Sequence, residues 1–175
     1  MDRRDSKFDK EKKVGPSLDS TQRYLVRMQS LCSSREMCAA DVKKRLEKAE
    51  LEKAEINDII GKLIEDGFVD DSRYAGAFVR DKAKFSGWGP RKIEFELRKK
   101  QIDSAIIGKA LSTIDADARL EKLERLLEQK LKSIKLEEER DKVMAKLMRF
   151  AVGRGFGYED VSKSIKKILE KRVNK

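Results

Sequence analysis

Histidine is absent from this chain of 175 residues, and cysteine and proline occur only twice each. Without histidine, acid–base catalysis or a four-ligand zinc site would have to rely on Lys, Asp, Glu and two cysteines. We therefore expect no enzyme, no metal and no cofactor. The chain also lacks an apolar run near the roughly 20 residues that span a bilayer, so we expect no membrane partner.

The N-terminal residues are rich in Asp, Arg and Lys and lack the apolar core of a signal peptide. We therefore expect a cytoplasmic protein. Disulfides are rare in that compartment, so Cys32 and Cys38 are interpreted as small side chains on helix faces. Charged residues make up 42% of the chain and long β-branched runs are missing, a composition that favours thin helices with one apolar stripe each.

The stretch 70–111 predicts three short helices separated by two breaks. Asp71 is expected to be the N-cap of the first helix. Gly89 ends the turn that follows, and Pro90 suits the first position of the second helix, where its missing N–H costs nothing. Asp103 is expected to cap the third helix.

Similar signals occur earlier in the chain. Ser33 and Glu36 have the spacing of a capping box, which predicts that a helix begins there. Gly67 follows an apolar helical pattern and is expected to end it in a left-handed conformation.

Apolar positions recur along the chain with a period of about 50 residues. A shift of 51 residues brings Leu46 onto Leu97, and a further shift of 54 brings Ile102 onto Phe156. We therefore predict an all-α tandem array of three three-helix repeats that forms an elongated, curved molecule. The predicted divisions are an arm of residues 1–18, disordered or loosely attached, and repeats over 19–69, 70–114 and 115–175.

The net charge of +10 favours anionic partners, and it is distributed unevenly. Residues 41–66 contain six basic and eight acidic side chains, whereas residues 80–100 contain eight and three. Residues 140–175 contain eleven and four. A basic helix face is often merely solvated, but this regional excess favours binding. The predicted basic binding residues are Arg80, Lys84, Arg91, Lys92, Arg98, Lys99, Arg149, Arg154, Lys163, Lys166 and Lys167.

Trp88, between two glycines, is the only tryptophan. It could stack on a base or enter a partner's groove, or it could pack the interhelix turn onto its neighbour. The glycines of residues 153–157 resemble part of a phosphate loop. They lack the Gly-Lys-Ser/Thr ending, so we interpret them as a turn between helices.

The central motifs resemble those of the RecX family of recombination regulators. The matching segments are DDSRYAGAFVR at 70–80, GWGPRKI at 87–93, ELRKKQI at 96–102 and RFAVGRGF at 149–156. The resemblance covers about residues 19–171. Gln101 occupies a position where glycine is common in the family.

This resemblance implies a modulator of RecA, the recombinase that coats single-stranded DNA. A RecX-like protein would lie in the groove of the RecA–DNA filament as a monomer and suppress ATP hydrolysis and strand exchange. Its own binding of single-stranded DNA would be weak and salt-sensitive. Two alternatives remain open from the residues alone. One is a stand-alone DNA-binding module similar to helix-turn-helix folds, and the other is a helical adaptor for a different acidic protein.

Overall fold

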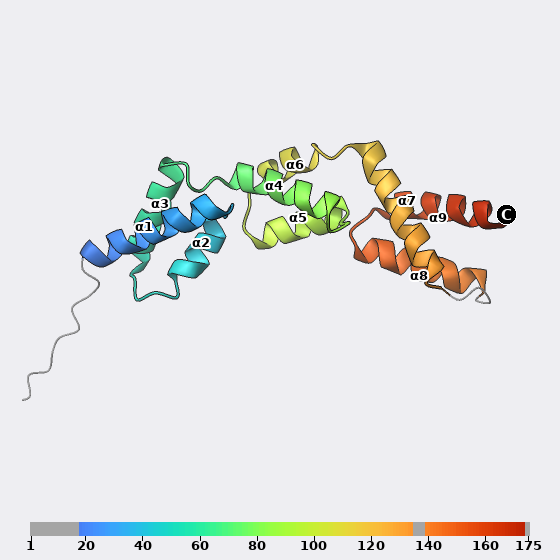
Figure 1. Cartoon of the computed structure of the whole chain (residues 1–175), viewed down its shortest axis with the longest axis horizontal. Coiled ribbons are helices and arrows are strands. Elements are labelled where there is room, and N and C mark those ends of the chain that lie inside the picture. Colours follow the sequence, from blue (N-terminus) through green and yellow to red (C-terminus); the bar gives the residue numbers. More distant parts are fainter. Residues whose placement is uncertain (1–17, 135–138, 174–175) are drawn as a thin grey trace, which may run out of the picture.

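The structure, a computed structural model, describes residues 18–134 and 139–173, and this part of the chain contains nine helices and no strand. Figure 1 shows the helices in three groups along an extended axis. The helices are α1 (Leu18–Ser34), α2 (Ala39–Leu46), α3 (Lys53–Glu65), α4 (Asp71–Lys84), α5 (Pro90–Lys99), α6 (Ser104–Leu111), α7 (Ala116–Lys132), α8 (Arg140–Gly153) and α9 (Tyr158–Val173). Residues 1–17 of the predicted arm, and the predicted end of the last helix at Lys175, lie outside the described residues.

Each group of three helices packs mainly on itself. Helices α1 and α2 pack on α3, α4 packs on α5 and α6, and α7 packs on α8 and α9. We call α1–α3 the first unit, α4–α6 the second unit and α7–α9 the third unit. The predicted all-α array of three-helix repeats is confirmed, whereas the exact divisions at residues 69/70 and 114/115 stay a prediction.

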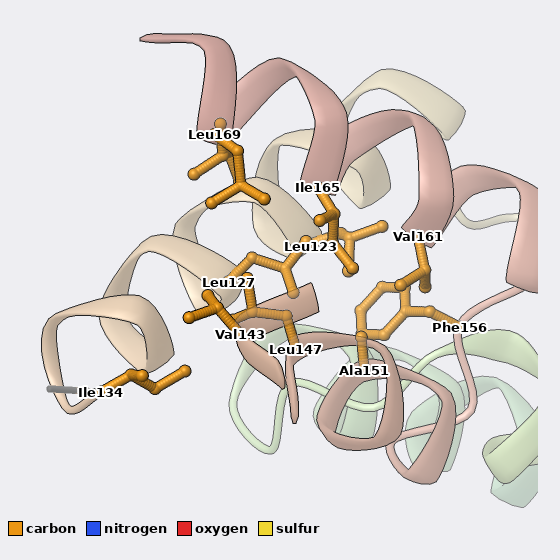
Figure 2. Close-up of a cluster of buried hydrophobic side chains, with 11 residues drawn as sticks. Leu123, Leu127, Ile134, Val143, Leu147, Ala151, Phe156, Val161, Ile165 and Leu169 are labelled. Carbon is orange, nitrogen blue, oxygen red and sulfur yellow. The ribbon is translucent and has the colours of Figure 1, made fainter. Parts of the chain in front are cut away.

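Each unit has its own hydrophobic core, because one apolar stripe from each helix faces inward. The first core contains Val42, Leu46 and Leu63, and the second contains Ile93 and Leu97. The third core is drawn in Figure 2, where side chains from α7, α8 and α9 converge. Its buried members are Leu123, Leu127, Ile134, Val143, Leu147, Ala151, Phe156, Val161, Ile165, Ile168 and Leu169.

The helix starts of the second unit follow local capping rules, with one correction. The N-cap of α4 is Asp70, whose Oδ1 accepts from the N–H groups of Ser72 and Arg73 at 2.8 and 3.0 Å. The prediction of Asp71 is therefore wrong by one residue. Pro90 and Asp103 have their predicted roles at the starts of α5 and α6.

The predicted helix start at Ser33 is wrong, because α1 continues through Ser34 and α2 begins at Ala39. The Ser33 hydroxyl donates back to the Gln29 carbonyl at 2.9 Å, so it supports the end of α1 instead of capping a new helix. Gly67 has the predicted left-handed conformation after α3, with a φ of 74°.

Candidate partner-binding surface

The turn between α4 and α5 brings the second unit against the third. Gly87 has a φ of 62°, a conformation that favours glycine, and the Trp88 N–H donates to the Lys82 carbonyl at 3.0 Å. The next N–H, that of Gly89, bonds outside its own unit and donates to the carbonyl of Arg154 at 2.7 Å. This turn therefore connects two units through the main chain.

A second main-chain hydrogen bond and two close approaches complete this contact, which we call the second junction. The Arg91 N–H donates to the Gly155 carbonyl at 3.1 Å. A Cβ atom at Gly89 would lie 2.4 Å from the carbonyl carbon of Gly155, and one at Gly155 would lie 2.3 Å from the Lys92 nitrogen. Gly155 also has a φ of 87°. Any side chain at these two glycines would therefore force the units apart.

Two cations reinforce the second junction by donating to carbonyl groups. A guanidinium nitrogen of Arg154 lies 3.2 Å from the Ser86 carbonyl, and its guanidinium carbon lies 4.7 Å from the Phe150 ring centroid. The Lys122 ammonium donates to the Lys84 carbonyl at 3.2 Å. Arg154, predicted as a binding residue, thus has a structural contact in this fold.

Beside the second junction lies a hollow of about 370 Å³, which we call the junction pocket. Its floor is mainly apolar and its rim carries four cationic side chains and one carboxylate. The residues that line it are Val79, Arg80, Ala83, Lys84, Trp88, Pro90, Thr113, Ile114, Asp115, Ala118, Arg119, Lys122 and Phe156. The fold thus brings three predicted residues, Arg80, Lys84 and Trp88, to one site.

Trp88 is half-buried, and lysine ammonium groups lie close to its ring. The ammonium of Lys92 lies 4.5 Å from the ring centroid and that of Lys82 lies 5.1 Å from it. The Phe78 ring meets the tryptophan in an edge-to-face arrangement at 6.3 Å. These contacts fit the interpretation of Trp88 as a residue that packs the turn onto its neighbours.

The outward face of α5 combines basic and aromatic side chains. Because α5 buries Ile93 and Leu97, its opposite side exposes Arg91, Phe95 and Lys99, four residues apart from one another. Phe95 is 60% exposed, and the Lys99 ammonium lies 5.5 Å from its ring centroid. We call this surface, with Arg98, the α5 face.

The cations of the α5 face differ in their partners. Arg98 donates to Glu94 at 2.8 and 3.0 Å, and Lys99 donates to Glu96 at 3.1 Å. Among the described residues, Arg91 has no carboxylate partner. Exposed pairs within one helix contribute little and exchange readily with outside partners, so all three cations remain available to an anionic surface.

The predicted residues of the third unit lie on the outer sides of α8 and α9. Lys163 pairs with Glu159 at 2.9 Å, and this hydrogen bond, with the attraction of the carboxylate, raises the pKa of Lys163. Lys167 reaches Glu124 of α7 at 2.6 Å, and Lys166 is exposed. Arg149 is also exposed on α8. These side chains stay a predicted binding set, separate from the α5 face and the junction pocket.

The first and second units meet through side chains, at what we call the first junction. The Lys100 ammonium donates to both oxygens of Asp41 at 2.6 and 2.9 Å, and it lies 5.5 Å from the Tyr74 ring centroid. Burial lowers the pKa of Lys100, but hydrogen bonds to Asp41 and Tyr74 and their negative charge together raise it. Cys38, at the start of α2, is buried in the second core, and burial raises the pKa of its thiol to about 11.

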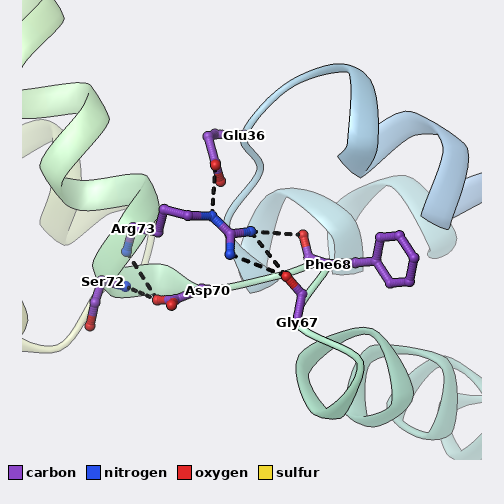
Figure 3. A network of polar contacts seen from close by, with 6 residues as sticks. All are labelled: Glu36, Gly67, Phe68, Asp70, Ser72 and Arg73. Atoms are coloured by element: carbon purple, nitrogen blue, oxygen red, sulfur yellow. Dashed lines mark hydrogen bonds and ion pairs between the residues drawn. The ribbon is translucent and has the colours of Figure 1, made fainter.

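A second polar cluster of the first junction surrounds Arg73 (Figure 3). Its guanidinium lies 2.7 Å from a Glu36 oxygen and donates to the Gly67 carbonyl at 3.1 and 3.2 Å and the Phe68 carbonyl at 3.4 Å. Arg73 therefore connects α4 to the end of the first unit. Beside this cluster, the Ala39 N–H donates to Asp71 at 2.9 Å.

Sequence reasoning missed several residues of these surfaces. The spacing of Phe95 from Arg91 and Lys99 is visible in the sequence and could have identified it. Lys122 could not be identified in this way, because only the fold brings α7 to the end of α4. A hollow of about 490 Å³ at the first junction could not be identified from the sequence either, because only the fold brings its lining together. The residues that line it are Arg35, Glu36, Met37, Asp41, Lys44, Arg45, Lys48 and Tyr74.

Within residues 18–134 and 139–173, no group of three or more His, Cys, Asp or Glu side chains is arranged to hold a metal ion. None of the helices in this described part of the chain has the length and apolar character needed to cross a membrane.

Comparisons with known proteins match the units that carry these surfaces. Residues 70–111 match the family model described as RecX, second three-helix domain, and residues 117–165 match RecX, third three-helix domain. A regulatory protein RecX from Clostridium tetani (strain Massachusetts / E88) is 35% identical over 115 residues, which cover 65% of this chain and 52% of that protein. A regulatory protein RecX from Mycobacterium sp. (strain JLS) is 30% identical over 129 residues, which cover 71% of this chain and 70% of that protein.

The fold is also found in solved structures. The crystal structure of RecX from Lactobacillus salivarius has a TM-score of 0.76 and 24% sequence identity, and the likeness covers 86% of this chain and 97% of that one. A second crystal structure of a regulatory protein RecX has the same TM-score and identity, with coverage of 84% and 71%. The chain spans about half the length of the Clostridium tetani relative.

Proposed function

The chain belongs to the RecX family of regulatory proteins, and we propose that it inhibits RecA by binding the filament that RecA forms on single-stranded DNA. Binding would suppress ATP hydrolysis and strand exchange, with no chemistry performed by this chain. The observation that carries the proposal is the coincidence of the two family matches with the two units that bear the α5 face and the junction pocket.

The distribution of charge supports a partner with a negative surface. Arg91 on the α5 face and Lys166 on α9 are exposed, with no carboxylate partner in the described part of the chain. Such cations attract an anionic partner and help to fix its orientation. Contacts of this kind speed association and weaken as salt rises, so direct binding of single-stranded DNA is proposed to be weak and salt-sensitive.

The shape supports a partner that is itself long and grooved. The three units lie along one axis (Figure 1), so a monomer could contact several neighbouring subunits of a filament at once. Contacts made by linked units add through their high effective concentration, so each contact can be weak. A partner that coats DNA implies action in the cytoplasm.

The test is DNA-dependent ATP hydrolysis by RecA, with this protein titrated in below one molecule per RecA and single-stranded DNA held in excess. We expect a steep fall in hydrolysis at substoichiometric amounts. An absence of inhibition, or inhibition that extra DNA removes, would contradict the proposal and favour the stand-alone DNA-binding module.

A charge-reversal variant locates the contact. Replacing Arg91, Arg98 and Lys99 by glutamate should weaken inhibition roughly tenfold or more, because three favourable charges become repulsive. The matched control replaces three exposed lysines of the first unit, Lys43, Lys53 and Lys62, by glutamate. Each variant replaces three positive charges by three negative ones, so the net charge of both falls from +10 to +4. Equal loss in the two variants would remove the α5 face from the proposal.

A further inference from the structure

We propose that the junction pocket receives one large apolar side chain from an acidic segment of a protein partner. This inference deepens the proposed function and rests on it, since it names the chemistry by which a protein of the filament would be held. The pocket belongs to both the second and third units, whose relative position is fixed by the glycines of the second junction.

The lining of the pocket selects an apolar occupant. Ala83, Pro90 and Ile114 are only partly buried and contribute apolar surface, and the volume is about 370 Å³. A cavity of roughly 150 Å³ is enough to hold a benzene molecule, so this hollow can accept a leucine or an aromatic side chain. Removing such a side chain from water is favourable in proportion to its area.

The rim of the pocket selects acidic neighbours for that side chain. Arg80 is exposed, with no ion pair among the described residues, and Lys122 donates to an uncharged carbonyl. Lys84 adds a third cation, whereas Asp115 is the single carboxylate of the lining. The Asp115 side chain accepts from the Ala118 N–H at 2.7 Å as the cap of α7. The rim therefore keeps a positive excess that an acidic segment would neutralise.

The remaining cation of the rim is largely satisfied. Arg119 reaches Asp160 at 3.3 Å, while its buried Nε has no hydrogen-bond partner. This residue adds little charge to the rim, and the proposal does not depend on it.

Single-stranded nucleic acid fits the pocket less well. A base needs an exposed aromatic face for stacking, but Trp88 has lysine ammonium groups of Lys82 and Lys92 near its ring and Phe156 is only 2% exposed. The apolar floor also offers few groups to the polar edge of a base. An aliphatic or aromatic side chain makes no such demand.

The experiment measures the binding of short labelled peptides to the full chain by fluorescence anisotropy. The peptides share one frame of Asp and Glu, with Leu, Phe, Trp or Gly at the centre. We expect the three apolar anchors to bind about tenfold more tightly than Gly. Equal binding of all four peptides would overturn the proposal.

Matched variants locate the peptide. Ala118→Phe fills the pocket from its rim and should weaken the anchored peptides about tenfold. Ala116→Phe lies in the same turn of α7, outside the lining, and should change binding less than about twofold. Arg80→Glu should also weaken binding, whereas Lys109→Glu on α6 should not. Equal effects within either pair would overturn the assignment, as would binding of oligo(dT) that Ala118→Phe abolishes.

Inhibition of RecA by the same proteins separates the two proposals. If the wild-type chain inhibits RecA while the peptides with an apolar anchor bind no more tightly than the Gly peptide, this inference fails and the proposed function stands. If anchored peptides bind at the pocket but the wild-type chain does not inhibit RecA, the proposed function fails and the acidic segment belongs to another protein.

Discussion

The two junctions connect similar three-helix units by different means. At the second junction, two hydrogen bonds join main chain to main chain, and the glycines approach until no Cβ atom could fit. At the first junction, charged side chains make the principal polar contacts, Lys100 with Asp41 and Arg73 with Glu36, beside the buried Cys38. We therefore expect the second junction to depend mainly on its glycines, and the first to respond to pH and salt.

The difference also appears in backbone conformation. The positive-φ residues of the second junction, Gly87 and Gly155, are glycines that adopt this region without strain. Beside the first junction, Gln101 follows Lys100 with a φ of 59°, which costs a non-glycine residue energy. We therefore expect the second and third units to move together as one body, and the first unit to be attached more adjustably.

The largest expected effect comes from replacing Gly155 by alanine. The new Cβ would lie too close to the backbone of Lys92, and the alanine would have a strained positive φ. We therefore expect a loss of about 3 kcal/mol in the free energy of unfolding. Gly153→Ala is the matched control, because a Cβ there meets nothing within 4 Å. Urea unfolding measures both; equal stability of the two variants would contradict the close approach.

Alkaline pH should weaken the first junction. Burial raises the pKa of the Cys38 thiol from 9.0 to about 11, so the unfolded chain releases this proton at lower pH than the native protein. Stability is then full below pH 9 and falls by about 2 kcal/mol as pH rises to 11. Unfolding of wild type and Cys38→Ala across this range checks the sign. A parallel pH dependence in both proteins would refute this cause.

Breaking the ion pair of the first junction should have a somewhat smaller effect. Lys100→Met leaves Asp41 half-buried without its cation, and we expect a loss of about 1–2 kcal/mol. Lys99→Ala, which removes an exposed pair on the same helix, should cost no more than about 0.5 kcal/mol. Thermal unfolding compares them, and the account is wrong if Lys99→Ala proves the more damaging.

The smallest expected effect is a gain. Gln101→Gly relieves the left-handed strain after α5 without touching Lys100, and we expect about 0.5–1 kcal/mol of added stability. Chemical denaturation measures the change. Destabilisation would mean that the glutamine side chain makes a contribution larger than the strain.

Much of the architecture could be predicted because it depends on local rules. Pro90 and Asp103 begin helices for reasons contained in single residues, and the period of about 50 residues follows from repeated apolar positions. The capping box predicted at Ser33 failed because the hydroxyls of Ser33 and Ser34 donate back to carbonyl groups of α1, which continues through Ser34.

The surfaces were less accessible to sequence reasoning. The excess of basic residues directed attention to the second and third units, but it could not separate Arg154, which holds the second junction, from Arg91, which faces solvent. Nor could it pair Gly89 with Gly155, since these residues meet only when the units are placed side by side. The binding roles of the basic residues stay a prediction.

The most direct test of the central claim measures distances across each junction by pulsed electron spin resonance. Spin labels would be attached to cysteines introduced at the exposed positions Asn57, Ser104 and Gln129, with the wild-type chain as the labelling control because its two cysteines are buried. The account predicts a narrow distribution between residues 104 and 129, and a broader one between 57 and 104 that widens with salt. A distribution across the second junction as broad as that across the first would contradict it.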